Sequence, residues 1–94
     1  MSGPIDRVKS TPHSTDEDVK STGGWFGGAV LFTDGTNDAT LKIFDGNPGT
    51  RRFFLKVKGA DMQAGGMLTW PIEMTTSTRV VITGSGADSQ VFWQ

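Results

Sequence analysis

The sequence predicts an all-β domain, a small β-sandwich or jelly-roll-like barrel, and three observations support this prediction. Short stretches alternate apolar and polar residues with a period of two, as in Phe53–Lys58 and Leu68–Met74. Clusters of Gly, Asp, Asn and Ser recur about every ten residues between these stretches, a spacing typical of strands in a sandwich or small jelly roll. No segment shows a convincing apolar period of 3.6 residues, so the helix content should be low.

The first three predicted strands are Ala29–Thr33, Ala39–Asp45 and Phe53–Lys58. The turn sequences DGTND and DGNPGT separate them, and both are rich in residues that tolerate positive φ or bond their own backbone. In the third strand, apolar residues alternate with Lys56 and Lys58, which indicates one buried face and one solvated face.

The last three predicted strands are Leu68–Met74, Arg79–Thr83 and Gln90–Trp93, after the turn sequences GADMQAGG, TTST and GSGADS. Pro71 has no backbone N–H, so its strand should lie at a sheet edge or carry a bulge. Alternation then predicts the residues on the inward faces. They are Leu31, Leu41, Ile43, Phe53, Leu55, Val57, Leu68, Trp70, Ile72, Val80, Ile82 and Val91.

The composition changes once along the chain, near Gly23. Residues 1–22 contain only four large apolar side chains, which are Met1, Ile5, Val8 and Val19. Such a segment buries too little surface to offset the entropy of ordering it. The sequence therefore predicts a flexible polar N-terminal arm over residues 1–22 and a β-sandwich domain over residues 23–94.

The residue inventory argues against catalysis and against bound cofactors. The chain has no Cys and a single histidine, His13, which excludes thiolate zinc sites, cysteine nucleophiles and sites that need several histidines. The aspartates in turn sequences are interpreted as acceptors for backbone N–H groups; they are Asp34, Asp38, Asp45, Asp61 and Asp88. We expect no catalytic residue, no metal and no cofactor.

Charge and hydropathy limit the partners. A formal net charge of −1 gives no general attraction to nucleic acid or to an anionic membrane, so neither is expected as a partner. The N-terminus MSGPIDRVKS lacks the apolar region of a signal peptide, which favours synthesis in the cytoplasm. The basic residues of Lys42–Lys58 are interpreted as a solvated face that blunts edge pairing, with nucleic-acid binding as the alternative.

Aromatic residues are the candidate functional residues. Adjacent strand residues point to opposite faces, so one member of each pair Trp25–Phe26 and Phe92–Trp93 should lie outside the core. Phe44 and Phe54 fall on the outer side of their strands. Exposed aromatic residues are typical of protein interfaces. The predicted oligomer or partner interface therefore comprises Trp25, Phe26, Phe44, Phe54, Phe92 and Trp93.

Three segments carry a resemblance to a known group of proteins. TDGTNDATLKIFDG, MLTWPIEM and TRVVITGSGADSQVFW are similar to segments of the small all-β structural proteins of tailed-bacteriophage virions. The resemblance covers about residues 23–94 and rests on turn chemistry and strand order. Such proteins are β-sandwich or jelly-roll modules that decorate capsids or form head spikes, often as trimers.

The resemblance implies a non-enzymatic virion structural protein, a capsid decoration, cement or spike. Its expected partners are further copies of itself, with a trimer favoured over a dimer, and a phage capsid or neck protein. The alternative is a carbohydrate-binding or adhesive β-sandwich that uses Trp25, Trp70 or Trp93 as a stacking platform.

Overall fold

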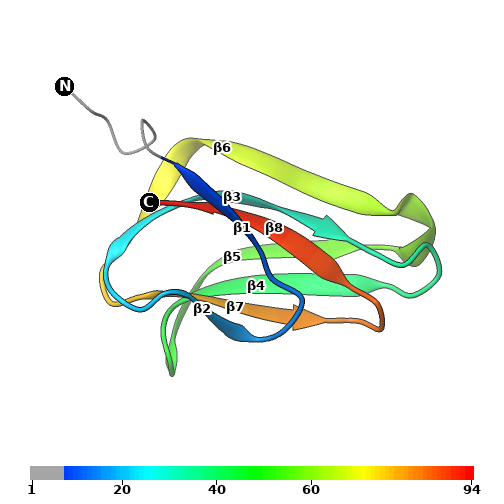
Figure 1. Cartoon of the computed structure of the whole chain (residues 1–94), viewed down its shortest axis with the longest axis horizontal. Coiled ribbons are helices and arrows are strands. Elements are labelled where there is room, and N and C mark those ends of the chain that lie inside the picture. Colours follow the sequence, from blue (N-terminus) through cyan, green and yellow to red (C-terminus); the bar gives the residue numbers. More distant parts are fainter. Residues whose placement is uncertain (1–7) are drawn as a thin grey trace.

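The protein folds as two antiparallel β-sheets stacked face to face (Figure 1). The structure is a computed structural model that describes residues 8–94. Its strands are β1 (Lys9–Pro12), β2 (Glu17–Lys20), β3 (Gly24–Phe32), β4 (Ala39–Gly46), β5 (Gly49–Val57), β6 (Gln63–Met74), β7 (Thr78–Thr83) and β8 (Asp88–Trp93). Within residues 8–94 the one helical element is a single 3₁₀ turn, Gly59–Asp61, which agrees with the low helix content expected.

The strand order is that of a jelly roll. One sheet has the order β1-β8-β3-β6, called sheet A below, and the other has the order β2-β7-β4-β5, called sheet B. Each of the first four strands pairs with one of the last four in reverse order: β1 with β8, β2 with β7, β3 with β6 and β4 with β5. An antiparallel ribbon with this pairing, folded over into two sheets, is a jelly roll. The predicted fold class is confirmed.

The flexible arm predicted over residues 1–22 is wrong for the part of it that the structure describes. β1 pairs with β8, and β2 pairs with β7, so these two short strands complete one edge of each sheet (Figure 1). Side-chain hydrogen bonds fix them: Gln90 Nε2 donates to Ser10 Oγ at 2.6 Å, and Ile82 N–H donates to the Asp16 carboxylate at 2.8 Å. Residues 1–7 of the predicted arm lie outside the described residues.

The core lies between the sheets and largely follows the predicted alternation. Of the predicted core residues, Leu31, Leu41, Ile43, Val57, Val80 and Val91 are buried, and Phe53, Leu55, Leu68, Ile72 and Ile82 pack against them while partly exposed. Five further buried residues were not among the predicted core residues: Phe26, Ala29, Ala39, Met74 and Ala87. Phe26 has the largest of these five side chains. It is fully buried, and its ring centroid lies 4.9 Å from that of Phe53.

Trp70 is not a core residue, although alternation predicted it there. The register between β3 and β6 shifts at this point: Phe26 pairs with Ile72, but Gly28 pairs with Met67. Four residues of β6 therefore lie opposite Gly27 alone, and this bulge places the Trp70 side chain outside the sandwich, 83% exposed. β6 is also the edge strand of sheet A, so both alternatives predicted from Pro71 are realised.

Glycine allows the two strands to approach at this bulge. Gly28 has a φ of 122°, and a Cβ atom added to it would overlap the carbonyl oxygen of Gly66 in β6. A residue with a side chain would be strained in its backbone and would collide with the neighbouring strand. The register shift that exposes Trp70 thus depends on glycine at position 28.

Candidate functional site

The six predicted interface residues divide between the core and the outer faces of the sandwich. As alternation requires, one member of each adjacent pair points inward: Phe26 is fully buried, and Trp93 packs against the core. Trp25 and Phe92 are the outward members, on the far side of sheet A. Phe26 has no exposed surface, so its assignment to an interface is corrected: it is a core residue.

Trp93 belongs to a polar chain that holds β1 in place. Its indole Nε1 donates to Thr11 Oγ1 at 2.9 Å, and the Lys9 ammonium lies 5.0 Å from the ring centroid. Thr11 Oγ1 is also 2.7 Å from His13 Nε2, while His13 Nδ1 is 2.7 Å from a carboxylate oxygen of Glu17. His13 is therefore a buried structural residue that links the ends of β1 and β2.

The outer face of sheet A carries four large apolar side chains beside polar ones such as Gln90, which pairs with Val30. Trp25, Val30 and Phe32 alternate along β3 with buried residues, and Phe92 lies beside them on β8. Each of the four is partly exposed. Aromatic and aliphatic side chains gathered in this way on one outer face are typical of a surface that a partner covers.

The outer face of sheet B combines aromatic and basic side chains. Phe54 is 44% exposed, and the Arg51 guanidinium lies 5.2 Å from its ring centroid. Phe44 lies on β4, with Val81 and Arg79 on the neighbouring strand β7. Arg79 Nη1 donates to the Asp18 carboxylate of β2 at 3.3 Å.

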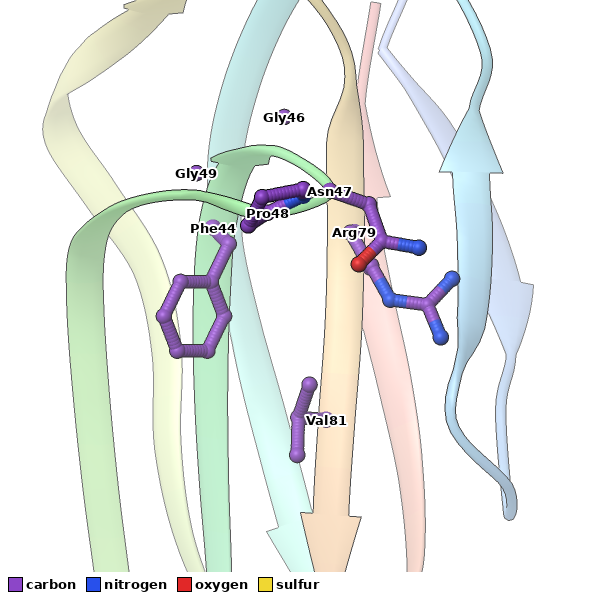
Figure 2. Close-up of a pocket in the computed structure, with 7 residues that line it drawn as sticks. All are labelled: Phe44, Gly46, Asn47, Pro48, Gly49, Arg79 and Val81. Carbon is purple, nitrogen blue, oxygen red and sulfur yellow. The ribbon is translucent and has the colours of Figure 1, made fainter.

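A cavity of about 210 Å³ opens on this face of sheet B. Figure 2 shows the Phe44 ring and the Val81 side chain on adjacent strands, with the β4–β5 turn, residues 46–49, arching over them. Asn47 and Pro48 form the overhang, and the Arg79 guanidinium closes the side toward β2. The result is an apolar pocket with a cation and an amide at its rim.

Other large apolar side chains are exposed at the edge formed by β6. Trp70 is the most exposed, and Met67 of the same strand is 57% exposed. Alternation predicted Trp70 in the core, and no sequence pattern predicted the cavity. Pro71 could have indicated that Trp70 is exposed, because it predicted the bulge that turns Trp70 outward.

Four of the five turn aspartates accept from backbone N–H groups, as predicted; they are Asp34, Asp38, Asp45 and Asp88. The Asp34 carboxylate accepts from the N–H groups of Thr36 and Asn37 within its own turn, and these bonds lower its pKa. The carboxylate of Asp38 accepts from Gly59 N–H at 2.9 Å. The carboxyl groups of Asp34 and Asp38 therefore act as structural hydrogen-bond acceptors.

Asp45 connects two distant loops. Its carboxylate accepts from the N–H groups of Thr75, Thr76 and Ser77 and from the Thr75 hydroxyl. The N–H donors of Thr75 and Thr76 lower the pKa of Asp45 to about 2, because they stabilise the ionised form. This carboxylate therefore anchors the β6–β7 connection to the end of β4.

Residues 8–94 contain neither a cluster of metal-binding side chains nor a helix that could cross a membrane. No three His, Asp or Glu side chains lie close enough together to hold a metal ion. No helix in that range is long and apolar enough to cross a membrane.

A comparison of the chain with protein-family models, curated proteins and solved structures finds no match.

Proposed function

We propose that the chain is a non-enzymatic structural module that self-associates and forms a capsid-associated decoration, cement or spike of a tailed-bacteriophage virion. The observation that carries the proposal is the outward placement of large apolar side chains on both sheets and on the β6 edge, with Trp70 83% exposed. A monomer gains nothing from such side chains in water, whereas burial between subunits removes their apolar surface from solvent.

The size of the core supports self-association. Among residues 8–94, eleven apolar residues are buried, and three of them are alanines. A core this small stabilises a domain only modestly, and oligomerisation adds buried apolar area without disulfides or metal. We therefore expect a homo-oligomer, with a trimer favoured over a dimer.

The virion context rests on the sequence resemblance and on the architecture. Jelly rolls occur among viral capsid proteins, although the same fold also serves lectins and other proteins. Immunogold labelling of particles from the host that encodes this chain tests the location. We expect labels on the capsid or neck of intact particles, and labels only on soluble material would contradict it.

Carbohydrate binding is the second candidate, and the exposure of Trp70 favours it. Three tryptophans were predicted as stacking platforms. The Trp93 ring already contacts Thr11 and Lys9, and the Trp25 side chain is partly buried. An indole ring projecting from a bulge suits stacking on a sugar. Titration with a glycan panel separates the two candidates: quenched fluorescence that Trp70→Ser abolishes, in a chain that stays monomeric, would favour carbohydrate binding.

A further inference from the structure

We propose that the Trp70 side chain of one copy inserts into the cavity beneath the β4–β5 turn of a second copy. This inference rests on the proposed self-association and names the two surfaces that make it. The inserting surface is the bulge of β6, and the receiving surface is the outer face of sheet B. The two surfaces lie on different parts of the chain, so each copy carries both an inserting and a receiving surface.

The bulge presents Trp70 as a preformed projection. Residues 68–71 lie opposite Gly27 alone, so the backbone leaves the plane of sheet A and carries the indole ring into solvent. Pro71 follows directly and fixes its own φ, which limits the freedom of the segment. A large ring on a restricted backbone loses little conformational entropy when a partner covers it.

The cavity has the size and lining for one aromatic side chain. An apolar cavity of about 150 Å³ holds a benzene molecule, and pockets for drug-sized ligands begin at about 300 Å³. At about 210 Å³, this cavity lies between the two. Phe44 offers an aromatic contact, Val81 an aliphatic one and Arg79 a planar cation, and all three suit an indole ring (Figure 2).

Charge complementarity identifies the occupant as another copy of this chain. Glu73 is the single charged residue of β6 and lies three positions after Trp70. Three basic side chains lie at or beside the cavity: Arg79 lines it and also contacts the Asp18 carboxylate, and Arg51 and Lys42 pair with Phe44 and Val81 in the sheet. Docking of the bulge therefore brings a carboxylate to a basic surface, which an incoming basic segment would not do.

The geometry requires at least two copies and leaves binding capacity on each. Trp70 is exposed in its own chain and is not among the residues that line the cavity. After one contact forms, the first copy still has a free cavity and the second still has a free Trp70. Contacts that run in one direction close into a ring of three or more subunits or continue as a chain, and a ring of three fits the proposed trimer. Two reciprocal contacts related by a two-fold axis would instead close a dimer of about 20 kDa.

A complementation experiment tests the pairing of the two surfaces. Trp70→Ser removes the inserting side chain, and Val81→Glu places a carboxylate in the cavity, where its cross-strand neighbour Lys42 offsets the charge. Far-UV circular dichroism verifies that each variant remains folded. Each variant alone should lose at least tenfold in self-association. Their equimolar mixture should form a species of about 20 kDa, two copies of the 10.1 kDa chain, and nothing larger.

Met62→Ser is the matched control, because it removes an exposed apolar side chain that lies outside the strands and should leave assembly unchanged. If the wild type is oligomeric and neither Trp70→Ser nor Val81→Glu dissociates it, the inference is overturned. The proposed self-association would then remain intact. The inference also fails if both variants dissociate and their mixture stays monomeric, since two unlike surfaces must complement each other. A monomeric wild type would contradict the proposed function itself.

Discussion

Asp45 is the residue through which solution conditions act most directly on this fold. Its carboxylate joins the end of β4 to the β6–β7 connection, and its nearest partner, Thr75, is 30 residues away in sequence. Because the folded state lowers the pKa of Asp45 to about 2 from a reference value of 3.8, the ionised carboxylate stabilises the fold. That contribution is fully present above pH 3.8 and is lost as the pH falls through about 2.

Asp45→Asn should lower the free energy of unfolding at pH 7 by about 1–2 kcal/mol, the lower part of the range for hydrogen bonds to a charged group, because solvent reaches the site. The amide places an N–H donor where the carboxylate accepted from Thr75 or Thr76. Urea unfolding of both proteins at several pH values checks this, with Asp34→Asn as a control whose contacts stay within one turn. A difference between wild type and Asp45→Asn that does not shrink towards pH 2 would contradict the account.

Burial separates the consequences of two leucine truncations. Leu41→Ala should destabilise the protein by about 2–5 kcal/mol, because the side chain is fully buried and leaves a cavity. Leu55→Ala should cost clearly less, since Leu55 is partly exposed at the edge strand β5 and water replaces its lost contacts. Urea unfolding measures both, and equal losses would show that the two positions contribute equally to the core.

At the level of the elements, β1 and β2 show how hydrogen bonds hold strands that lack apolar periodicity. β1 reads KSTP and β2 reads EDVK, and Val19 is the one apolar residue of β2 that packs against the core. Ladder hydrogen bonds to β8 and β7 and the chain from Trp93 through Thr11 to His13 supply the rest. Both strands close the roll, because β8 and β7 would otherwise be open edges.

Trypsin should cleave after Lys9 and Lys20 no faster than after Lys56 in β5, because all three sites lie in paired strands. His13→Ala should accelerate cleavage at Lys9 and Lys20 while leaving Lys56 unchanged, since it removes the contacts that join β1 to β2. Mass spectrometry of the digest identifies the sites. Rapid release of residues 1–20 from a folded remainder would restore the flexible-arm interpretation.

Strands that bury one apolar face could be predicted from the sequence. Strands that are held mainly by hydrogen bonds could not. Alternation located β4, β7 and the C-terminal part of β6, because residues such as Leu41, Ile43 and Val80 report directly on an inward face. It missed the N-terminal part of β6, of which residues 63–66 were predicted as a turn. It could not locate β1 and β2, whose partners lie some 60 to 80 residues away in the chain. It misplaced Trp70 because a bulge inserts extra residues and breaks the period of two.

The candidate site was predictable in part. Trp25 and Phe92 follow from alternation alone, since their neighbours Phe26 and Trp93 occupy the core. The cavity combines Phe44, Val81 and the β4–β5 turn, which adjoin only once β4 pairs with β7. Sequence spacing carries no information on that pairing, so the receiving surface emerges only from the fold.

At the scale of the whole molecule, the two outer surfaces have different characters. The outer face of sheet A combines large apolar side chains with polar and acidic ones such as Gln90 and Asp88, whereas that of sheet B interleaves aromatic residues with arginine and lysine. Surfaces of different character on one sandwich allow a contact between unlike surfaces of neighbouring copies, which is the kind of contact proposed for Trp70 and the cavity.

Multi-angle light scattering of the wild-type chain at micromolar concentration tests the central claim, self-association, most directly. The account predicts a mass of about 30 kDa, three copies of the 10.1 kDa chain, which declines towards a single copy on dilution. A mass that stays near 10.1 kDa at every concentration would contradict it.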